Sequence, residues 1–315
     1  TEDLPLMIFA NWRGFSGGQR DMYDEVLKYG SMIVDSFVAY EQPIFVFIPP
    51  YAEIRGGAWV VVDPSINPAV MEMYATSGTA RGGVLEANGV ASVKYRTKDL
   101  ISTMHRLDDV LIALDAKLKE RITDEVRNET EDSITKREQS LLPVYEQIAV
   151  QFCELHDTPG RMKAVGVIEN EVEWKNSRSF FFWRLRRKLA EFDLRKKMQQ
   201  AGDVGRSVKS LSPIEASALM KEWFLQTPSM TNSMWNDDKV MLSWMAQSHE
   251  VLEQKVVDMA RECVAQEVFQ VMTAGGSTSE IGTAGLIKGL SQALNTLSVS
   301  EQEKVKEMLK GALNF

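Results

Sequence analysis

The feature that most constrains the fold is a pair of short, wholly apolar runs separated by a segment with helical spacing. Residues 6–10 (Leu-Met-Ile-Phe-Ala) and 44–48 (Ile-Phe-Val-Phe-Ile) have the length and residue types of buried strands. Between them, apolar residues recur every three or four positions: Met22, Val26, Tyr29, Ile33 and Phe37. A strand, helix, strand order of this kind is typical of α/β folds.

From about residue 97 the sequence changes to a helical composition. Residues 99–148 are rich in Leu, Ile, Glu, Lys and Arg, with few Gly or Pro before Pro143, and predict long helices. We also expect helices over residues 180–200, 213–271 and 300–313, with a flexible linker at 274–279 before the last one. A boundary near residue 100 would separate a chemistry-bearing α/β part from a mostly helical part.

The overall composition excludes several classes of function. A formal charge of −8 argues against general nucleic-acid binding, which needs a basic face. Two cysteines, Cys153 and Cys263, cannot form a disulfide framework, and the three histidines have no zinc-site spacing. No apolar run reaches the roughly 20 residues that span a bilayer. We therefore expect a soluble protein of a reducing compartment, and a start without Met, directly before a strand, indicates a piece of a longer protein.

The densest set of chemically useful residues lies between the first strand and the first helix, at residues 11–21 (Asn-Trp-Arg-Gly-Phe-Ser-Gly-Gly-Gln-Arg-Asp). α/β folds place ligands at such turns. Glycines there let the backbone approach a substrate, and Arg13 and Arg20 carry planar guanidinium groups suited to a carboxylate or phosphate. A plain tight turn with Asp21 near the helix N-terminus explains the same residues equally well.

A second cluster, residues 49–59, follows the second strand and contains Gly56-Gly57. Adjacent glycines after a strand can direct two backbone N–H groups at one point, which is the geometry of an oxyanion hole. The alternative is a loop that needs only conformational freedom. Because the oxyanion role requires Gly57 at a helix N-terminus, we predict a helix over residues 59–62 (Trp-Val-Val-Val), against their β propensity.

A third cluster, residues 80–86 (Ala-Arg-Gly-Gly-Val-Leu-Glu), precedes a short segment with alternating residue types. The alternation predicts an extended conformation over residues 93–96, which would put Lys94 and Arg96 on one face. Two such cations could hold the phosphates of a nucleotide-like ligand. A solvated strand edge is the alternative.

Five long, non-repetitive strings include these clusters: residues 11–22, 54–67, 71–75, 83–86 and 177–189. In this order they resemble the C-terminal carboxyltransferase half of eukaryotic multidomain acetyl-CoA carboxylases, strongly to about residue 200. The resemblance implies a crotonase-like ββα superhelix over residues 1–210, with an α/β core over 1–100 and a helical extension over 100–210. A further helical region would follow over residues 211–315.

The resemblance assigns roles to residues at matching positions. Arg13 would bind the carboxyl group being transferred. The amides of Gly56 and Gly57 would stabilise the negative ureido oxygen of biotin once carbon dioxide has left, and Glu86 would line the site. Lys94 and Arg96 would hold coenzyme A.

Three further positions, Trp12, Val26 and Asp63, fall where herbicide-sensitive members of the family contact or support inhibitors. The resemblance also implies the reaction, in which a carboxyl group moves from carboxybiotin to acetyl-CoA and gives malonyl-CoA, the first committed step of fatty acid synthesis. The active site would need the N-terminal half of the carboxyltransferase, so the chain alone would be inactive. A biotin carrier domain and a homodimer are implied as partners, in the cytoplasm or a plastid, with no metal, nucleic acid or membrane span.

Two other functions stay open. A crotonase-superfamily acyl-CoA hydratase or isomerase would need a pair of carboxylates, for which Glu53 and Glu86 are the candidates, and a noncatalytic dimerisation module would need neither. His105 and His156 are not expected to be catalytic. A basic run favours the solvated face of a helix over a phosphate or nucleic-acid site: Arg184, Arg186, Arg187, Lys188, Arg195, Lys196 and Lys197.

Overall fold

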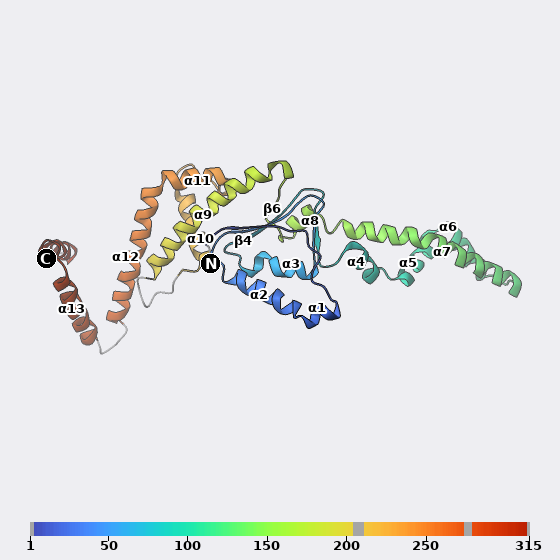
Figure 1. The fold of residues 1–315 in the computed structure, drawn as a ribbon, viewed down its shortest axis with the longest axis horizontal. Helices are drawn as coiled ribbons and strands as arrows, with labels where there is room; N and C mark the ends of the chain where they lie inside the picture. The colour runs from blue at the N-terminus through green and yellow to red at the C-terminus, as the bar shows by residue number, and fades with distance from the viewer. Residues whose placement is uncertain (1–2, 204–210, 274–278, 314–315) are drawn as a thin grey trace. The chain divides into compact units, whose positions relative to one another are not determined.

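The computed structural model describes residues 3–203, 211–273 and 279–313 (Figure 1). The chain divides into two compact units, Thr1–Leu185 and Arg186–Phe315, here called unit 1 and unit 2. The linker predicted at residues 274–279 lies outside the described residues except for Ser279, with which helix α13 begins.

Unit 1 contains two parallel sheets. Sheet A has the order β1-β2-β4-β6, with β1 at Leu6–Phe9, β2 at Ile44–Ile48, β4 at Met71–Ala75 and β6 at Asn170–Glu171. Sheet B pairs β3 (Glu53–Arg55) with β5 (Arg81–Gly83). Every residue of β2 and β4 is buried, which explains the wholly apolar sequence of β2, since strands of a parallel sheet are covered on both faces. The two predicted strands are confirmed.

Two ββα repeats follow one another along the chain. The first consists of β2, β3 and α3 (Gly56–Val62), and the second of β4, β5 and α4 (Ala87–Lys94). In each repeat the first strand joins sheet A and the second joins sheet B, so equivalent strands pair in parallel. This is the ββα superhelix of the crotonase-like fold, and the predicted fold class is confirmed. The helix predicted over residues 59–62 is confirmed as well, because the β-branched run lies within α3.

The helical segment between β1 and β2 is interrupted. It forms α1 (Gln19–Tyr23) and α2 (Val26–Val38), separated at Glu25, whose φ of 62° is left-handed. The expected apolar stripe is only partly correct, because Phe37 is buried but Met22 and Tyr29 are exposed. Phe15, in the loop after β1, packs against Gly30 of α2. This part of α2 is therefore covered by the loop, and its expected apolar residue Tyr29 stays exposed.

Long helices follow the superhelix, as predicted: α5 (Thr97–Leu107), α6 (Asp109–Leu118) and α7 (Asp124–Glu154), which pack on one another (Figure 1). Pro143 lies inside α7 at an exposed position, and it removes one N–H donor from the helix. The extended conformation predicted for residues 93–96 is wrong. Lys94 ends α4 and Arg96 caps α5, because the alanine face of α4 packs against Ala149 and Cys153 of α7.

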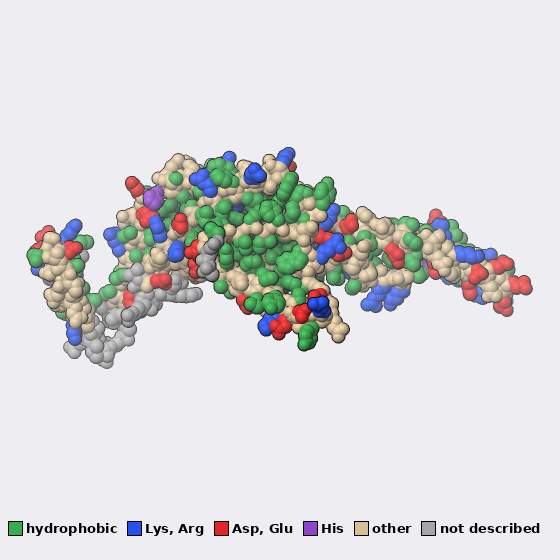
Figure 2. Space-filling model, viewed as in Figure 1, with side chains coloured by type: hydrophobic (Ala, Val, Ile, Leu, Met, Phe, Trp, Pro, Cys, Tyr) green, Lys and Arg blue, Asp and Glu red, His purple; other side chains and the backbone are tan. Residues whose placement is uncertain are grey.

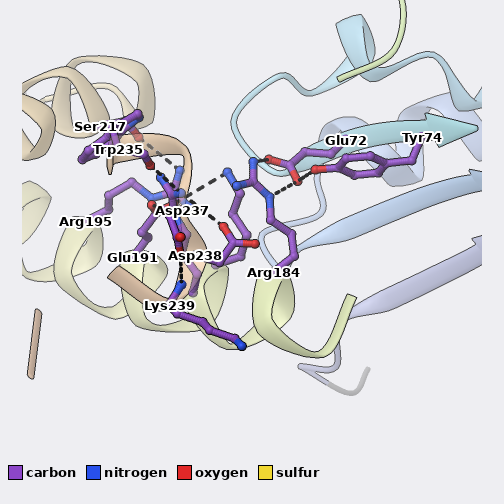
Figure 3. A network of polar contacts seen from close by, with 12 residues as sticks. Glu72, Tyr74, Arg184, Glu191, Arg195, Ser217, Trp235, Asp237, Asp238 and Lys239 are labelled. Atoms are coloured by element: carbon purple, nitrogen blue, oxygen red, sulfur yellow. Dashed lines mark hydrogen bonds and ion pairs between the residues drawn. The ribbon is translucent and has the colours of Figure 1, made fainter. Parts of the chain in front are cut away.

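The end of unit 1 contains α8 (Pro159–Ala164), η2 (Trp174–Asn176) and the first residues of α9 (Ser177–Gly202). Phe180 and Phe181 of α9 pack edge-on against Tyr74 of β4. In Figure 3, Arg184 points at Glu72, and its Nη2 and Nε lie 2.6 and 2.8 Å from the two carboxylate oxygens. Tyr74 donates to the same carboxylate at 2.7 Å, so this buried charge is fixed to α9.

Unit 2 is helical, as predicted: α10 (Pro213–Gln226), η3 (Met234–Asn236), α11 (Asp238–Gln247), α12 (His249–Thr273), α13 (Ser279–Thr296) and α14 (Val299–Leu313), with α13 not expected from the sequence. Its Met and Trp residues form a core around Met220, Phe224 and Trp244.

The solvated face expected for the basic run is wrong for three residues. Arg187 is buried, with Nε 2.6 Å from Glu191 and Nη1 2.7 Å from the Trp235 carbonyl oxygen. Arg195, also buried, donates to Ser217 (Figure 3). Arg184 is the third, through its pairing with Glu72. Glu191 lies four positions after Arg187 on the same helix, whereas Asp238 and Glu72, the other carboxylates paired with Arg187 and Arg184, lie on other elements and are not visible in the local charge pattern.

Across the described parts of the chain, every helix is too short or too polar to cross a bilayer.

Candidate active site at the N-terminus of α3

The candidate site forms where the loop after β1 lies along β3. Trp12 forms a parallel bridge with Ile54; its N–H donates to the Glu53 carbonyl at 2.7 Å, and its own carbonyl accepts from Arg55 N–H at 2.9 Å. These backbone bonds continue sheet B by one residue. They bring the residues after Trp12 to the start of α3, so two glycine clusters separated in sequence become neighbours.

Gly14 and Gly57 meet at this point. Gly14 has a φ of 115°, a backbone conformation that residues with a Cβ rarely adopt. A Cβ on Gly14 would lie 3.5 Å from the Gly57 nitrogen and 4.0 Å from the Ala58 nitrogen. Glycine at position 14 therefore leaves open the space in front of these amides. Because Gly56, Gly57 and Ala58 form the first turn of α3, their N–H groups have no carbonyl partner inside the helix.

Phe15 closes the other side of the turn. A Cβ on Gly57 would lie only 2.9 Å from Phe15 Cδ2, and the Phe15 ring also packs edge-on against Trp12, with 5.4 Å between ring centroids. Position 57 therefore accepts only glycine without a shift of Phe15.

Arg13 projects from the same loop toward two carboxylates. Its Nη1 lies 2.9 Å from Glu86 Oε1, and its Nη2 pairs with Glu53 Oε1. The side chain is still 67% exposed. A cleft of about 200 Å³ lies beside it, lined by Arg13, Glu53, Arg55, Arg81, Glu86, Ala87, Asn88 and Glu154. Arg13 and Glu86, 73 positions apart in the sequence, thus meet at this cleft, and Gly14, the residue after Arg13, lies against Gly57.

Glu53 and Arg55 are ionised partners. Burial alone would raise the pKa of Glu53, but hydrogen bonds and charges from Arg55 and Arg13 outweigh it and lower that pKa. For Arg55 burial opposes the charge, and its hydrogen bonds to Asp157 and Glu53 nevertheless raise its pKa. Both side chains are therefore charged at neutral pH.

Sequence reasoning missed the contribution of Arg55 and Asp157. The Arg55 side chain is buried, and its Nη1 donates to Asp157 Oδ2 at 2.6 Å and to the Leu85 carbonyl at 2.9 Å. The position of Arg55, directly before the glycine pair, was a usable signal. No local pattern identifies Asp157, which is 102 positions away.

The three proposed inhibitor positions have different surroundings. Trp12 lies beside the glycine turn. Asp63 ends α3, where it accepts from Trp59 Nε1 at 2.7 Å and from Ser65 N–H at 2.8 Å, so it supports the helix. Burial would raise the pKa of Asp63, but these hydrogen bonds lower it. Val26 is the first residue of α2 and is half-buried.

Lys94 and Arg96 are exposed and do not line the cleft beside Arg13. Lys94 is the last residue of α4, and Glu86 precedes the first, so the two lie roughly 12 Å apart along the helix axis at 1.5 Å per residue.

The sequence of residues 1–189 matches the family model described as "Carboxyl transferase domain". The chain belongs to this family.

Relatives in the family agree. The chain is 41% identical to "Acetyl-CoA carboxylase" of Dictyostelium discoideum over 319 residues, which is 99% of this chain and 13% of that protein. It is 56% identical over 200 residues to "Acetyl-CoA carboxylase, mitochondrial" of Saccharomyces cerevisiae strain RM11-1a, covering 63% of this chain and 9% of that protein. The predicted resemblance to multidomain acetyl-CoA carboxylases is confirmed, and it extends past residue 200. The chain spans only 13% and 9% of the lengths of these two relatives.

Among solved structures, the β subunit of P. aeruginosa geranyl-CoA carboxylase is similar over 58% of this chain and 28% of that chain, with 16% identity and a TM-score of 0.39.

Within the described ranges of the carboxyl transferase chain, no three His, Cys, Asp or Glu side chains are grouped so that they could hold a metal ion.

Proposed function

We propose that this chain supplies the C-terminal half of an active site that transfers a carboxyl group from carboxybiotin to acetyl-CoA, giving malonyl-CoA. The observation that carries the proposal is the convergence of Arg13, Glu86 and the Gly56-Gly57 amides at the start of α3, in a member of the carboxyl transferase domain family. When bound, carboxybiotin supplies the carboxyl group.

Arg13 is suited to orient that carboxyl group. Its guanidinium is exposed and is held at two of its nitrogens by Glu53 and Glu86, so its direction is fixed before a substrate arrives. The planar guanidinium has five N–H donors, so a ligand oxygen can bind donors other than the two that these carboxylates engage. Glu86 would line the site. When a substrate carboxylate binds, Arg13 would either release Glu86 or bind both carboxylates at once.

The amides of Gly56 and Gly57 are suited to stabilise an anionic oxygen. They lie in the first turn of α3, next to space that a side chain on Gly14 would fill. Backbone donors stabilise developing negative charge without a titrating group. The reaction would then need no catalytic histidine from this chain.

Lys94 and Arg96 would bind the phosphates of coenzyme A. Both are exposed cations outside the cleft lining, and Lys94 lies roughly 12 Å from Glu86 along α4, a separation that a long substrate such as an acyl-CoA could span. Changing both to Ala should raise the KM for acetyl-CoA and leave kcat nearly unchanged. The measurement is the initial rate over a range of acetyl-CoA concentrations. An unchanged KM would mean that Lys94 and Arg96 belong to the solvated surface instead.

The implied partners are the N-terminal carboxyltransferase half, a biotin carrier domain and a second copy of the parent chain. The compartment would be the cytoplasm or a plastid, and a relative named as mitochondrial adds a third. A noncatalytic dimerisation module remains the other class of function, and it would not require an open space before the Gly57 amide.

A hydratase or isomerase is less well supported. It would use Glu53 and Glu86 as an acid and base pair, but both are engaged by Arg13, and the pKa of Glu53 is lowered where a general acid needs it raised.

The proposal is tested by assaying acetyl-CoA carboxylation and malonyl-CoA decarboxylation in the presence of biotin, with the N-terminal half supplied. Activity should appear with both halves and be absent with this chain alone. Hydration of an enoyl-CoA without carboxyl transfer would favour the hydratase, and no reaction with either substrate would favour the noncatalytic module.

A further inference from the structure

The buried carboxylate that pairs with Arg55 belongs to Asp157, which is not among the residues assigned to the candidate site. Asp157 lies in the turn between α7 and α8, and only 8% of the residue is exposed. Its backbone is fixed, because its carbonyl accepts from Gly82 N–H at 3.1 Å and its N–H donates to the Glu154 carbonyl at 3.2 Å. The Asp157 carboxylate is therefore presented to Arg55 from a defined position.

Three N–H groups of Arg55 are engaged by this arrangement. Its Nη1 donates to Asp157 Oδ2 and to the Leu85 carbonyl, and its Nε lies 3.0 Å from Glu53 Oε2. The residue is also the N-cap of α3, directly before Gly56 and Gly57. Fixing its side chain therefore fixes the turn that carries the two amides.

The room for the ion pair is limited. A Cβ on Gly83 would lie 3.0 Å from Asp157 Oδ1 and 3.1 Å from Arg55 Nη1, so glycine at position 83 allows β5 to pass against it. This close packing restricts both side chains to one arrangement.

Glu53 connects this buried pair to the exposed Arg13. One Glu53 oxygen accepts from Arg55 and the other pairs with Arg13. Because Asp157 balances the buried charge of Arg55, Glu53 can direct its second oxygen to Arg13. Without Asp157, Arg55 would be a buried cation with Glu53 as its remaining carboxylate partner, and Glu53 would be drawn toward it.

We propose that Asp157 is a positioning residue for the candidate site, acting through Arg55 and Glu53 to hold both Arg13 and the Gly56-Gly57 turn. This proposal rests on the proposed function, because it takes those groups as the site. It gives the α7–α8 turn, which lies outside the glycine clusters, a part in carboxyl transfer without contact with the substrate.

The first test measures amide hydrogen exchange by mass spectrometry in the 315-residue chain, which does not depend on activity. Asp157→Asn should speed exchange in peptides that cover residues 11–16 and 53–62, and leave β2 (Ile44–Ile48) unchanged. Asp108→Asn is the matched control, since it also removes a carboxylate from an arginine, at 2.8 Å from Arg137, but far along the chain at the start of α6. It should not affect either peptide.

If Asp157→Asn does not fold, the paired variant Asp157→Asn/Arg55→Gln leaves no uncompensated buried cation and permits the same comparison. Unchanged exchange over residues 53–62 in the folded variant would overturn the proposal.

The second test measures kinetics with the N-terminal half supplied. Asp157→Asn should lower kcat on the order of 10- to 100-fold, since small misplacements of a reacting group cost up to about 100-fold, with the KM for acetyl-CoA within about twofold of the original value. A general loss of structure would change both. In the Arg13→Ala background Asp157→Asn should have a much smaller effect than it has alone, because Asp157 acts in part through Arg13.

The outcomes separate the two proposals. Faster exchange together with a lower kcat supports the positioning role, and faster exchange with an unchanged kcat overturns it. If the unmodified enzyme transfers no carboxyl group, the proposed function fails, and the positioning role fails with it even where exchange shows that Asp157 holds the turn.

Discussion

Gly57 has room for a hydrogen atom but for no side chain on the face that meets Phe15, since a Cβ there would lie 2.9 Å from the ring. From the sequence alone, Gly57→Ala would be a mild change that keeps the N–H group. The contact with Phe15 means that alanine also disturbs the loop that carries Arg13. Alanine is still the right comparison for proline, because both add the same Cβ.

We expect Gly57→Pro to be much less active than Gly57→Ala. Both variants displace Phe15, but only proline removes the N–H donor, and losing one such donor typically costs about 2.7–4 kcal/mol, or roughly 100- to 1000-fold in kcat. The measurement is kcat, with coenzyme A affinity and Tm as controls, in the two-half enzyme. Equal kcat values for the two folded variants would remove the oxyanion role.

Arg13→Lys should be more harmful than its conserved charge suggests. The guanidinium holds Glu53 and Glu86 with separate nitrogens and keeps donors for a ligand, whereas one ammonium cannot reproduce that planar fork. We expect kcat/KM to fall by at least about tenfold, the equivalent of one charged hydrogen bond of about 1.5–3 kcal/mol. Arg20→Lys, at an exposed arginine paired only at 3.7 Å with Asp24, is the control and should be nearly silent.

At the scale of the elements, His105 joins three helices. On α5, its Nδ1 lies 2.6 Å from Asp115 of α6 and its Nε2 lies 2.7 Å from Glu138 of α7. Hydrogen bonds to Glu138 and then Asp115 raise the pKa of His105 above 6.5, against the opposing effect of burial. The residue that sequence reasoning set aside as non-catalytic is thus a structural bridge.

The sign of its pH dependence follows from the raised pKa. The stabilising contribution of His105 is complete below the unfolded pKa of about 6.5 and is lost as the pH rises through the folded value. We expect His105→Gln to destabilise α5–α7 at pH 6, by about 0.2–1 kcal/mol for each partly exposed pair, and much less at pH 9. Urea denaturation monitored by hydrogen exchange in these helices measures the difference.

The Asp108–Arg137 pair provides the control, because it joins α6 to α7 nearby. A hydrogen bond from Arg137 lowers the pKa of Asp108 and the same bond raises that of Arg137, so neither group titrates between pH 6 and 9. Arg137→Gln should therefore have the same effect at both pH values. A His105→Gln effect that is equally independent of pH would contradict the bridge.

At the scale of the whole molecule, unit 1 exposes apolar surface beside an edge strand. Among the described strands, β1 pairs only with β2, and Phe9 at its end is 60% exposed. A groove of about 720 Å³ lies along it, with an apolar lining that includes Leu6, Phe9, Phe45, Trp174, Phe181 and Phe182. Figure 2 shows hydrophobic side chains gathered over the strands of unit 1. Exposed edges and apolar patches promote association.

We therefore expect the isolated chain to self-associate as its concentration rises, and Phe9→Lys to reduce this by placing a charge on the edge. Val299→Lys, at a 78% exposed apolar residue of α14, should have little effect and serves as the control. Sedimentation velocity over a range of concentrations is the measurement. A wild-type chain that stays monomeric throughout would contradict the expectation.

The sequence by itself determined two of the six described strands, most of the helices, the ββα fold class and the family, because these depend on local periodicity and on long strings of residues in order. It also identified Arg13, the glycine pair and Glu86 as candidates. Only the tertiary structure decided that residues 93–96 are not extended, that Arg187 and Arg195 are buried and that Asp157 holds Arg55. Each of these depends on a partner far along the chain, and the energy of such a contact leaves no trace in the local pattern.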